Sequence, residues 1–104
     1  MTLSEVFIPK EEIDYAENSV VSKIIIKKPA GNITLFAFDK EEGLSEHSSP
    51  HEALIHGIDG KAEITIGGNI YILLQGNCII LPANIPHSVK AIEKFKMMLT
   101  MIKS

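Results

Sequence analysis

The sequence contains no arginine and no tryptophan, and it has a single cysteine. Its ten basic residues are all lysines, and only Lys27 and Lys28 are adjacent. Arginine is the side chain that pairs bidentately with phosphate and with guanine. The absence of arginine and of a basic cluster therefore argues against a nucleic-acid partner.

The lone Cys78 excludes a disulfide within the chain, so the apolar core must supply the stability. Cys78 begins the apolar run Cys78-Ile79-Ile80-Leu81, which is typical of a buried strand. No residue beside it in the sequence would activate its thiol. We therefore expect Cys78 to be a small core side chain and not a nucleophile.

No apolar run approaches the length of a membrane span, and the first five residues lack the basic start and apolar stretch of a signal peptide. We therefore expect a cytoplasmic protein without a membrane partner. Hydrophobic residues make up 45% of the chain and charged residues 22%, with a net charge of -3. This balance is typical of a globular domain, and 104 residues suffice for one domain, spanning residues 1–104.

Residues 1–18 form a polar arm with few apolar positions, and a turn of helix is expected after Pro9. From about residue 20 to 103, short runs rich in β-branched residues alternate with turn residues. The expected strands are 20–28, 33–38, 53–58, 61–66, 70–74, 78–81, 88–92 and 95–102. About eight short strands with almost no helix predict an all-β sandwich or barrel.

Two segments of this all-β chain carry histidines at a distinctive spacing. The first runs from Gly43 to Gly60 and includes His47, and the second runs from Gly76 to His87. Together they resemble the paired motifs of the cupin superfamily, over about residues 33 to 102. The resemblance implies a double-stranded β-helix, or jelly-roll, barrel that follows the polar arm.

The second segment matches the family's motif well. Gly76, Pro82 and His87 stand in register, and Asn84 replaces a glycine. Pro82 ends the preceding strand, where a ladder hydrogen bond would otherwise be needed. We expect His87 to be the first inward-pointing residue of the next strand.

The first segment matches only in part. His47 occupies the first histidine position, but Ser49 stands where a second histidine belongs and Ala53 where a glutamate belongs. Two of the family's four usual metal ligands are therefore missing. His47 and His87 remain at ligand positions.

Two interpretations of this departure compete. In one, His51 compensates, and His47, His51 and His87 bind a divalent transition metal (iron, manganese, nickel or zinc), with Glu52 beside them as a further ligand or acceptor. In the other, the histidines line a polar pocket without metal. In both, Ser49, Ala53 and Val89 share the pocket lining. His56 falls on the opposite face of its strand and is read as a surface residue.

The functional expectation follows from the same resemblance. A metal-bound barrel would be a dioxygenase- or isomerase-like enzyme acting on a small organic molecule, with no organic cofactor and no catalytic base identifiable in the sequence. The alternative is a non-catalytic, metal-free barrel that binds a small metabolite or serves as a regulatory module. Cupins commonly form dimers, so we expect a homodimer, with residues 20–28 as a strand that one copy could donate to the other.

Overall fold

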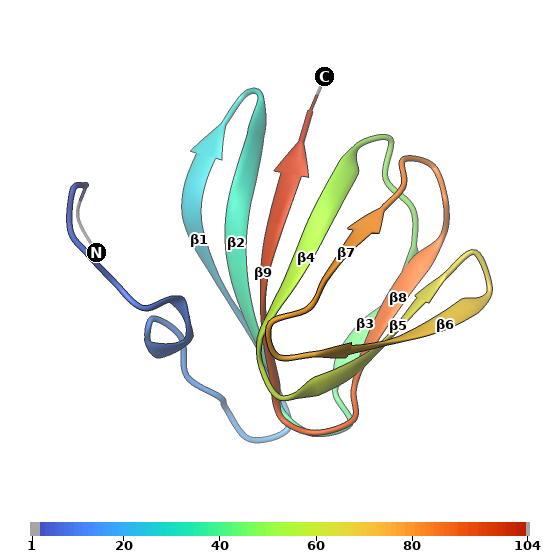
Figure 1. Cartoon of the computed structure of the whole chain (residues 1–104), viewed down its shortest axis with the longest axis horizontal. Coiled ribbons are helices and arrows are strands. Elements are labelled where there is room, and N and C mark those ends of the chain that lie inside the picture. The colour runs from blue at the N-terminus through green and yellow to red at the C-terminus, as the bar shows by residue number, and fades with distance from the viewer. Residues whose placement is uncertain (1–2, 104) are drawn as a thin grey trace.

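The computed structural model describes residues 3–103, and in this range it holds nine strands and one short 3-10 helix (Figure 1). The elements are η1 (Pro9–Glu11), β1 (Val20–Lys28), β2 (Gly31–Phe38), β3 (Gly43–His47), β4 (Glu52–Asp59), β5 (Lys61–Ile66), β6 (Asn69–Leu74), β7 (Cys78–Leu81), β8 (His87–Ala91) and β9 (Phe95–Ile102). All eight expected strands are present, and the helical turn begins at Pro9.

The strands form two antiparallel sheets. One has five strands in the order β1-β2-β9-β4-β7, and the other has four in the order β3-β8-β5-β6. The chain crosses repeatedly from one sheet to the other, which is the connectivity of a double-stranded β-helix. The expected jelly-roll barrel is therefore confirmed.

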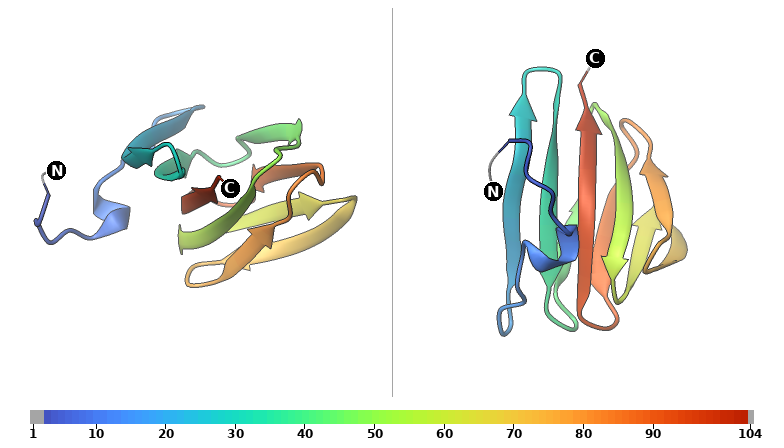
Figure 2. Two further views of the ribbon diagram at one scale, coloured as in Figure 1. Left: turned by 90° about the horizontal axis from the view of Figure 1, so that it is seen from above. Right: turned by 60° about the vertical axis from the view of Figure 1, so that its left-hand side comes forward.

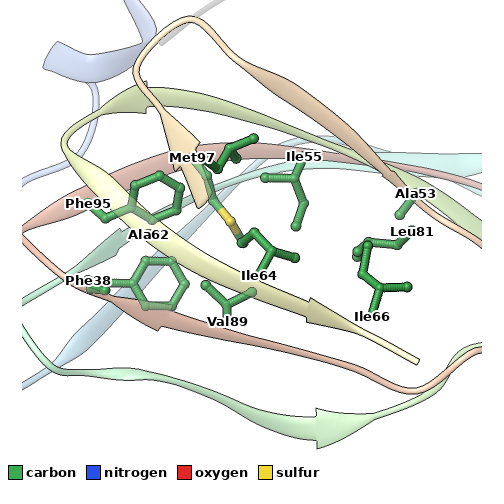
Figure 3. Close-up of a cluster of buried hydrophobic side chains, with 12 residues drawn as sticks. Phe38, Ala53, Ile55, Ala62, Ile64, Ile66, Leu81, Val89, Phe95 and Met97 are labelled. Atoms are coloured by element: carbon green, nitrogen blue, oxygen red, sulfur yellow. The ribbon is translucent and has the colours of Figure 1, made fainter. Parts of the chain in front are cut away.

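The core lies between the two sheets, and apolar side chains fill it (Figure 3). On β5, the buried residues Ala62, Ile64 and Ile66 alternate with half-buried polar residues, as their period of two predicts. From the opposite sheet, Phe95 and Met97 point inward and are almost completely buried. The apolar core that must stabilise a chain without disulfides is thus built by alternation along the strands.

Strand β3 is the element that the sequence did not predict. Four of its five residues are exposed, and it pairs only with β8 at the edge of the four-stranded sheet. An edge strand that buries almost nothing has no apolar alternation. The sequence therefore carried no periodic signal for it.

The expectation that Cys78 is buried was wrong. Strand β7 is the outer strand of the five-stranded sheet, and only Leu81 of its four residues is fully buried. Cys78 and Ile80 point away from the core and are exposed. An apolar run cannot by itself distinguish an edge strand from a central one.

The N-terminal arm packs against the outer face of the five-stranded sheet of its own chain (Figure 2). Ile13 is only 5% exposed and lies against Leu35 and Ala37 of β2. The Tyr15 hydroxyl donates a hydrogen bond of 2.6 Å to Asp59 Oδ2, and the Lys96 ammonium donates one of 2.6 Å to the Lys10 carbonyl. The arm is therefore a docked part of the fold, although its composition is mostly polar.

Within residues 3–103, no helix combines the length and the apolar character that a membrane crossing would require.

Candidate functional site

The two motif segments bring His47 and His87 together. His47 ends β3 and His87 begins β8, and the two residues are direct partners across these antiparallel strands. His87 is buried and points inward next to Ile66, whereas His47 lies on the exposed edge strand. Their rings meet edge to face with centres 4.4 Å apart. As expected, His87 is the first inward residue of its strand.

Backbone carbonyls fix the orientation of both rings. Nδ1 of His47 lies 2.8 Å from the Ser45 carbonyl oxygen, and Nδ1 of His87 lies 3.2 Å from the Ile85 carbonyl oxygen. A carbonyl oxygen can only accept, so these two contacts are hydrogen bonds in the tautomer that carries its proton on Nδ1. In neutral rings of this tautomer, both Nε2 atoms present a lone pair.

These two Nε2 atoms lie 3.2 Å apart. Two lone pairs at this distance repel each other unless a cation lies between them, either a proton or a metal ion. Burial lowers the pKa of His87 below its ordinary value, and the nearby His47 acts in the same direction, against a hydrogen bond to the Ile85 carbonyl. The neutral form of His87, which can bind a metal ion, is therefore favoured at neutral pH.

The separation suits a metal ion. Two imidazole nitrogens bound to one ion at about 2.0–2.1 Å stand roughly 2.8–3.4 Å apart at octahedral or tetrahedral angles. The observed 3.2 Å falls in this range. Hydrogen bonds from Nδ1 to a carbonyl are also the usual way in which metal-binding histidines are oriented. The pair therefore fits as two of the ligands of a divalent transition metal.

Among the residues that the structure describes, no third ligand joins the pair. Within residues 3–103, the structure contains no group of three histidine, cysteine or acidic side chains that could hold a metal ion. His51 is half-buried in the turn before β4, and its backbone N–H donates to the Ser49 hydroxyl. The three-histidine site with His51 therefore stays a prediction.

The residues expected to line a common pocket occupy different environments. Ala53 and Val89 are buried in the core, while Ser49 is half-buried in the β3–β4 connection. The Ser49 carbonyl accepts a hydrogen bond of 2.7 Å from the Asn84 N–H, which joins the loops of the two motif segments. His56 lies on the outer face of β4, opposite Ala53, as its position in the strand predicted.

The carbonyls of Ser45 and Ile85 are the functional groups that sequence reasoning missed. In each motif, the ring bonds the carbonyl two residues before its own histidine. Any residue type supplies a carbonyl, so no sequence signal identifies this contact.

Comparison with known proteins identifies the family to which the chain belongs. The sequence model of the cupin domain family matches residues 34–103 of this chain. A conserved protein of unknown function from Streptococcus pyogenes has a similar structure, with a TM-score of 0.95 and 32% identity over 100% of this chain and 91% of that one. A cupin 2 conserved barrel domain protein from Leptotrichia buccalis is 38% identical, with a TM-score of 0.87 over 90% of this chain and 46% of that one.

Among curated proteins, the chain is similar to a quercetin 2,3-dioxygenase from Bacillus subtilis (strain 168), with 38% identity over 47 residues. This match covers 45% of the chain and 14% of that protein. The family model, by contrast, covers most of the chain and both histidine segments. The chain belongs to the cupin family.

Proposed function

We propose that the chain binds a divalent transition-metal ion through the Nε2 atoms of His47 and His87 and acts there on a small organic molecule. The observation that carries the proposal is the pair of Nε2 atoms that face each other across 3.2 Å. Each is fixed by the hydrogen bond that its own ring makes to a backbone carbonyl. A metal ion would satisfy both at once.

The surroundings of the pair would leave open positions on the ion. Two histidines occupy two positions, and Ala53 takes the place of the family's glutamate, which leaves space and removes a negative charge. Ala53, Leu81 and Ile66 lie at one end of the core, and Ile66 is the strand partner of His87 (Figure 3). These apolar side chains would exclude water from a bound substrate.

A metal ion in this position would polarise a substrate oxygen or supply redox chemistry with dioxygen. The similarity to a quercetin 2,3-dioxygenase supports the dioxygenase reaction over the isomerase reaction. The supporting match covers less than half of this chain, so the substrate is proposed only as a small organic molecule.

A second candidate is a metal-free barrel that binds a small metabolite without catalysis. It is favoured by the missing third ligand within residues 3–103. The two candidates differ in one measurable property, which is stoichiometric metal binding that depends on both histidines.

Metal binding can be measured on untagged protein purified without chelator, by elemental analysis and by titration with zinc, manganese, iron(II) and nickel. We expect one ion per chain, and His47→Ala and His87→Ala should each weaken binding more than about 100-fold, because even residues that only orient a ligand account for 10–100-fold. Affinity should also fall in acid, and only at a pH below the ordinary histidine pKa of about 6.5, because burial lowers the pKa of His87 and protons compete for its Nε2 only below that lowered pKa.

The matched control is His56→Ala, which removes a histidine from the opposite face of β4 and should leave metal affinity unchanged. Absence of bound metal and of uptake of all four ions would overturn the proposal and favour the metal-free barrel. Binding that survives both His47→Ala and His87→Ala would do the same.

A further inference from the structure

A hollow of about 260 Å³ lies between the N-terminal arm and strand β4. Three segments line it, which are residues 8–10 of the arm, residues 56–58 of β4 and residues 75–76 of the turn between β6 and β7. The 3-10 helix η1 of the arm lies over the same sheet in Figure 2. His56 lies on the face of β4 opposite the core residue Ala53, so the hollow is separate from the interior into which His87 points.

The charges around the hollow favour an anionic ligand. Lys10 and His56 are its basic lining residues, and none of the lining residues is acidic. Beside it, the Lys96 ammonium is bonded to the Lys10 carbonyl, and Lys96 is only 9% exposed. Within residues 3–103, Lys96 forms no ion pair, because its strand partner Asp59 accepts the Tyr15 hydroxyl instead. A buried ammonium without a carboxylate is costly, so a bound anion would stabilise it.

Three side chains of the lining have hydrogen-bond donors that no group of the described chain accepts. Within residues 3–103, the Lys10 ammonium, the His56 ring and the Gln75 amide make no hydrogen bond. Each of them can donate to an anion. They come from three separate segments, so an anion in the hollow can be reached from three sides.

The backbone beneath these side chains is already hydrogen-bonded. The Gly57 N–H donates to the Asn77 carbonyl at 2.9 Å, and the Gly76 N–H donates to the Gly57 carbonyl at 2.8 Å. Many phosphate sites use successive backbone N–H groups, which these two glycines do not offer. A few side-chain donors match the two oxygens of a carboxylate better than the three of a phosphate. The chemistry of the hollow therefore favours a carboxylate.

We propose that this hollow binds a small organic acid, whose carboxylate is held by Lys10, His56 and Gln75. The apolar part of the acid lies against Ile8 and Ile58, which line the same hollow. This site is additional to the proposed metal site and does not depend on it.

The arm forms one wall of the site, so a bound acid links the arm to the sheet. Burial of Ile13 and the hydrogen bond between Lys96 and the Lys10 carbonyl already hold the arm in place. The acid adds a connection between Lys10 on the arm and His56 on β4. Because a ligand stabilises the state that binds it, hydrogen exchange of the arm amides should slow when the acid is added.

An NMR titration with sodium butyrate tests the site. Butyrate should shift the side-chain amide signals of Gln75 and the ring signals of His56 in a saturable manner. Lys10→Met and His56→Gln should each raise the dissociation constant about tenfold, because each removes one charge-assisted hydrogen bond. Inorganic phosphate and butylammonium, at matched ionic strength, should bind at least about tenfold more weakly than butyrate. A dispersed spectrum would establish that each variant is folded.

The matched control is Lys27→Met, because Lys27 is exposed on β1 and should not affect butyrate binding. His47→Ala should also leave butyrate binding unchanged, and its loss in this variant would assign butyrate to the histidine pair and overturn the proposal. Absence of saturable shifts at Gln75 and His56 would overturn it as well. So would binding that survives both Lys10→Met and His56→Gln, equal binding of phosphate, or equal weakening by Lys27→Met. Unchanged exchange of the arm amides at saturation would contradict the link to the arm.

Discussion

At the scale of single residues, two left-handed backbone positions hold the motif segments in place. Gly60 has a φ of +78° in the turn between β4 and β5, and a side chain there would overlap the carbonyl oxygen of Lys94. Asn84 has a φ of +65° and donates its N–H to the Ser49 carbonyl. Asparagine tolerates this conformation better than most residues, so the replacement of the motif's glycine by Asn84 preserves the local fold.

Alanine substitutions at Gly60 and Gly68 separate two contributions to the loss of stability, the left-handed backbone conformation and the steric overlap with Lys94. Gly68→Ala places a methyl group at a φ of +84° with no atom within 4 Å, so it should cost only about 1–2 kcal/mol of unfolding free energy. Gly60→Ala adds the overlap with Lys94 and should cost about 3 kcal/mol or more. Urea unfolding of both variants measures the difference. Equal losses would show that the approach of Lys94 does not constrain position 60.

The sequence identified two histidines of the candidate site, but it could not predict which ring nitrogen of each carries the proton. The motif spacing identified His47 and His87, and the structure places them as strand partners. The protonation of each ring depends on the carbonyls of Ser45 and Ile85, which no side-chain pattern encodes. The direction of the His51 side chain depends on an irregular connection, where neither a strand nor a helix period applies.

At the scale of elements, burial on one face explains which strands the sequence could predict. Strand β5 alternates fully buried and half-buried residues, and its period is visible in the sequence. Strand β3 buries almost no side chain, so the sequence did not predict it. Strand β7 lies at the edge of its sheet, so the expectation that Cys78 is buried was wrong. Edge strands are therefore the elements for which alternation gives the least information.

The arm shows how one apolar residue can dock a polar segment. Ile13→Ala should lower the unfolding free energy by about 2–4 kcal/mol, because Ile13 is buried against Leu35 and Ala37. Ile8→Ala in the same arm is the control, since Ile8 is 57% exposed, and it should change stability by less than about 0.5 kcal/mol. Chemical unfolding measures both. A similarly small effect of the two substitutions would contradict the docked position of the arm.

At the scale of the whole molecule, the fold followed from the sequence because many weak signals agreed. Short alternating runs, hairpin turns such as Asp59-Gly60 and the two motif segments all indicated one barrel, and the topology and the cupin family model confirm it. The outer face of the five-stranded sheet could not be predicted in this way. Strand order and register place Ile26, Ile33, Thr100, Leu54 and Ile80 in one row across this face, although these residues come from distant parts of the sequence.

The central claim is that the lone pairs of His47 and His87 face one another and share one metal ion. Long-range proton–nitrogen NMR of the four imidazole rings tests it most directly, because it reports which nitrogen of each ring carries a proton. The account predicts a proton on Nδ1 of both His47 and His87, and a shift of their two Nε2 signals, but not of those of His56, when zinc is added. A proton on Nε2 of either ring in the neutral protein, or no response of this pair to zinc, would contradict it.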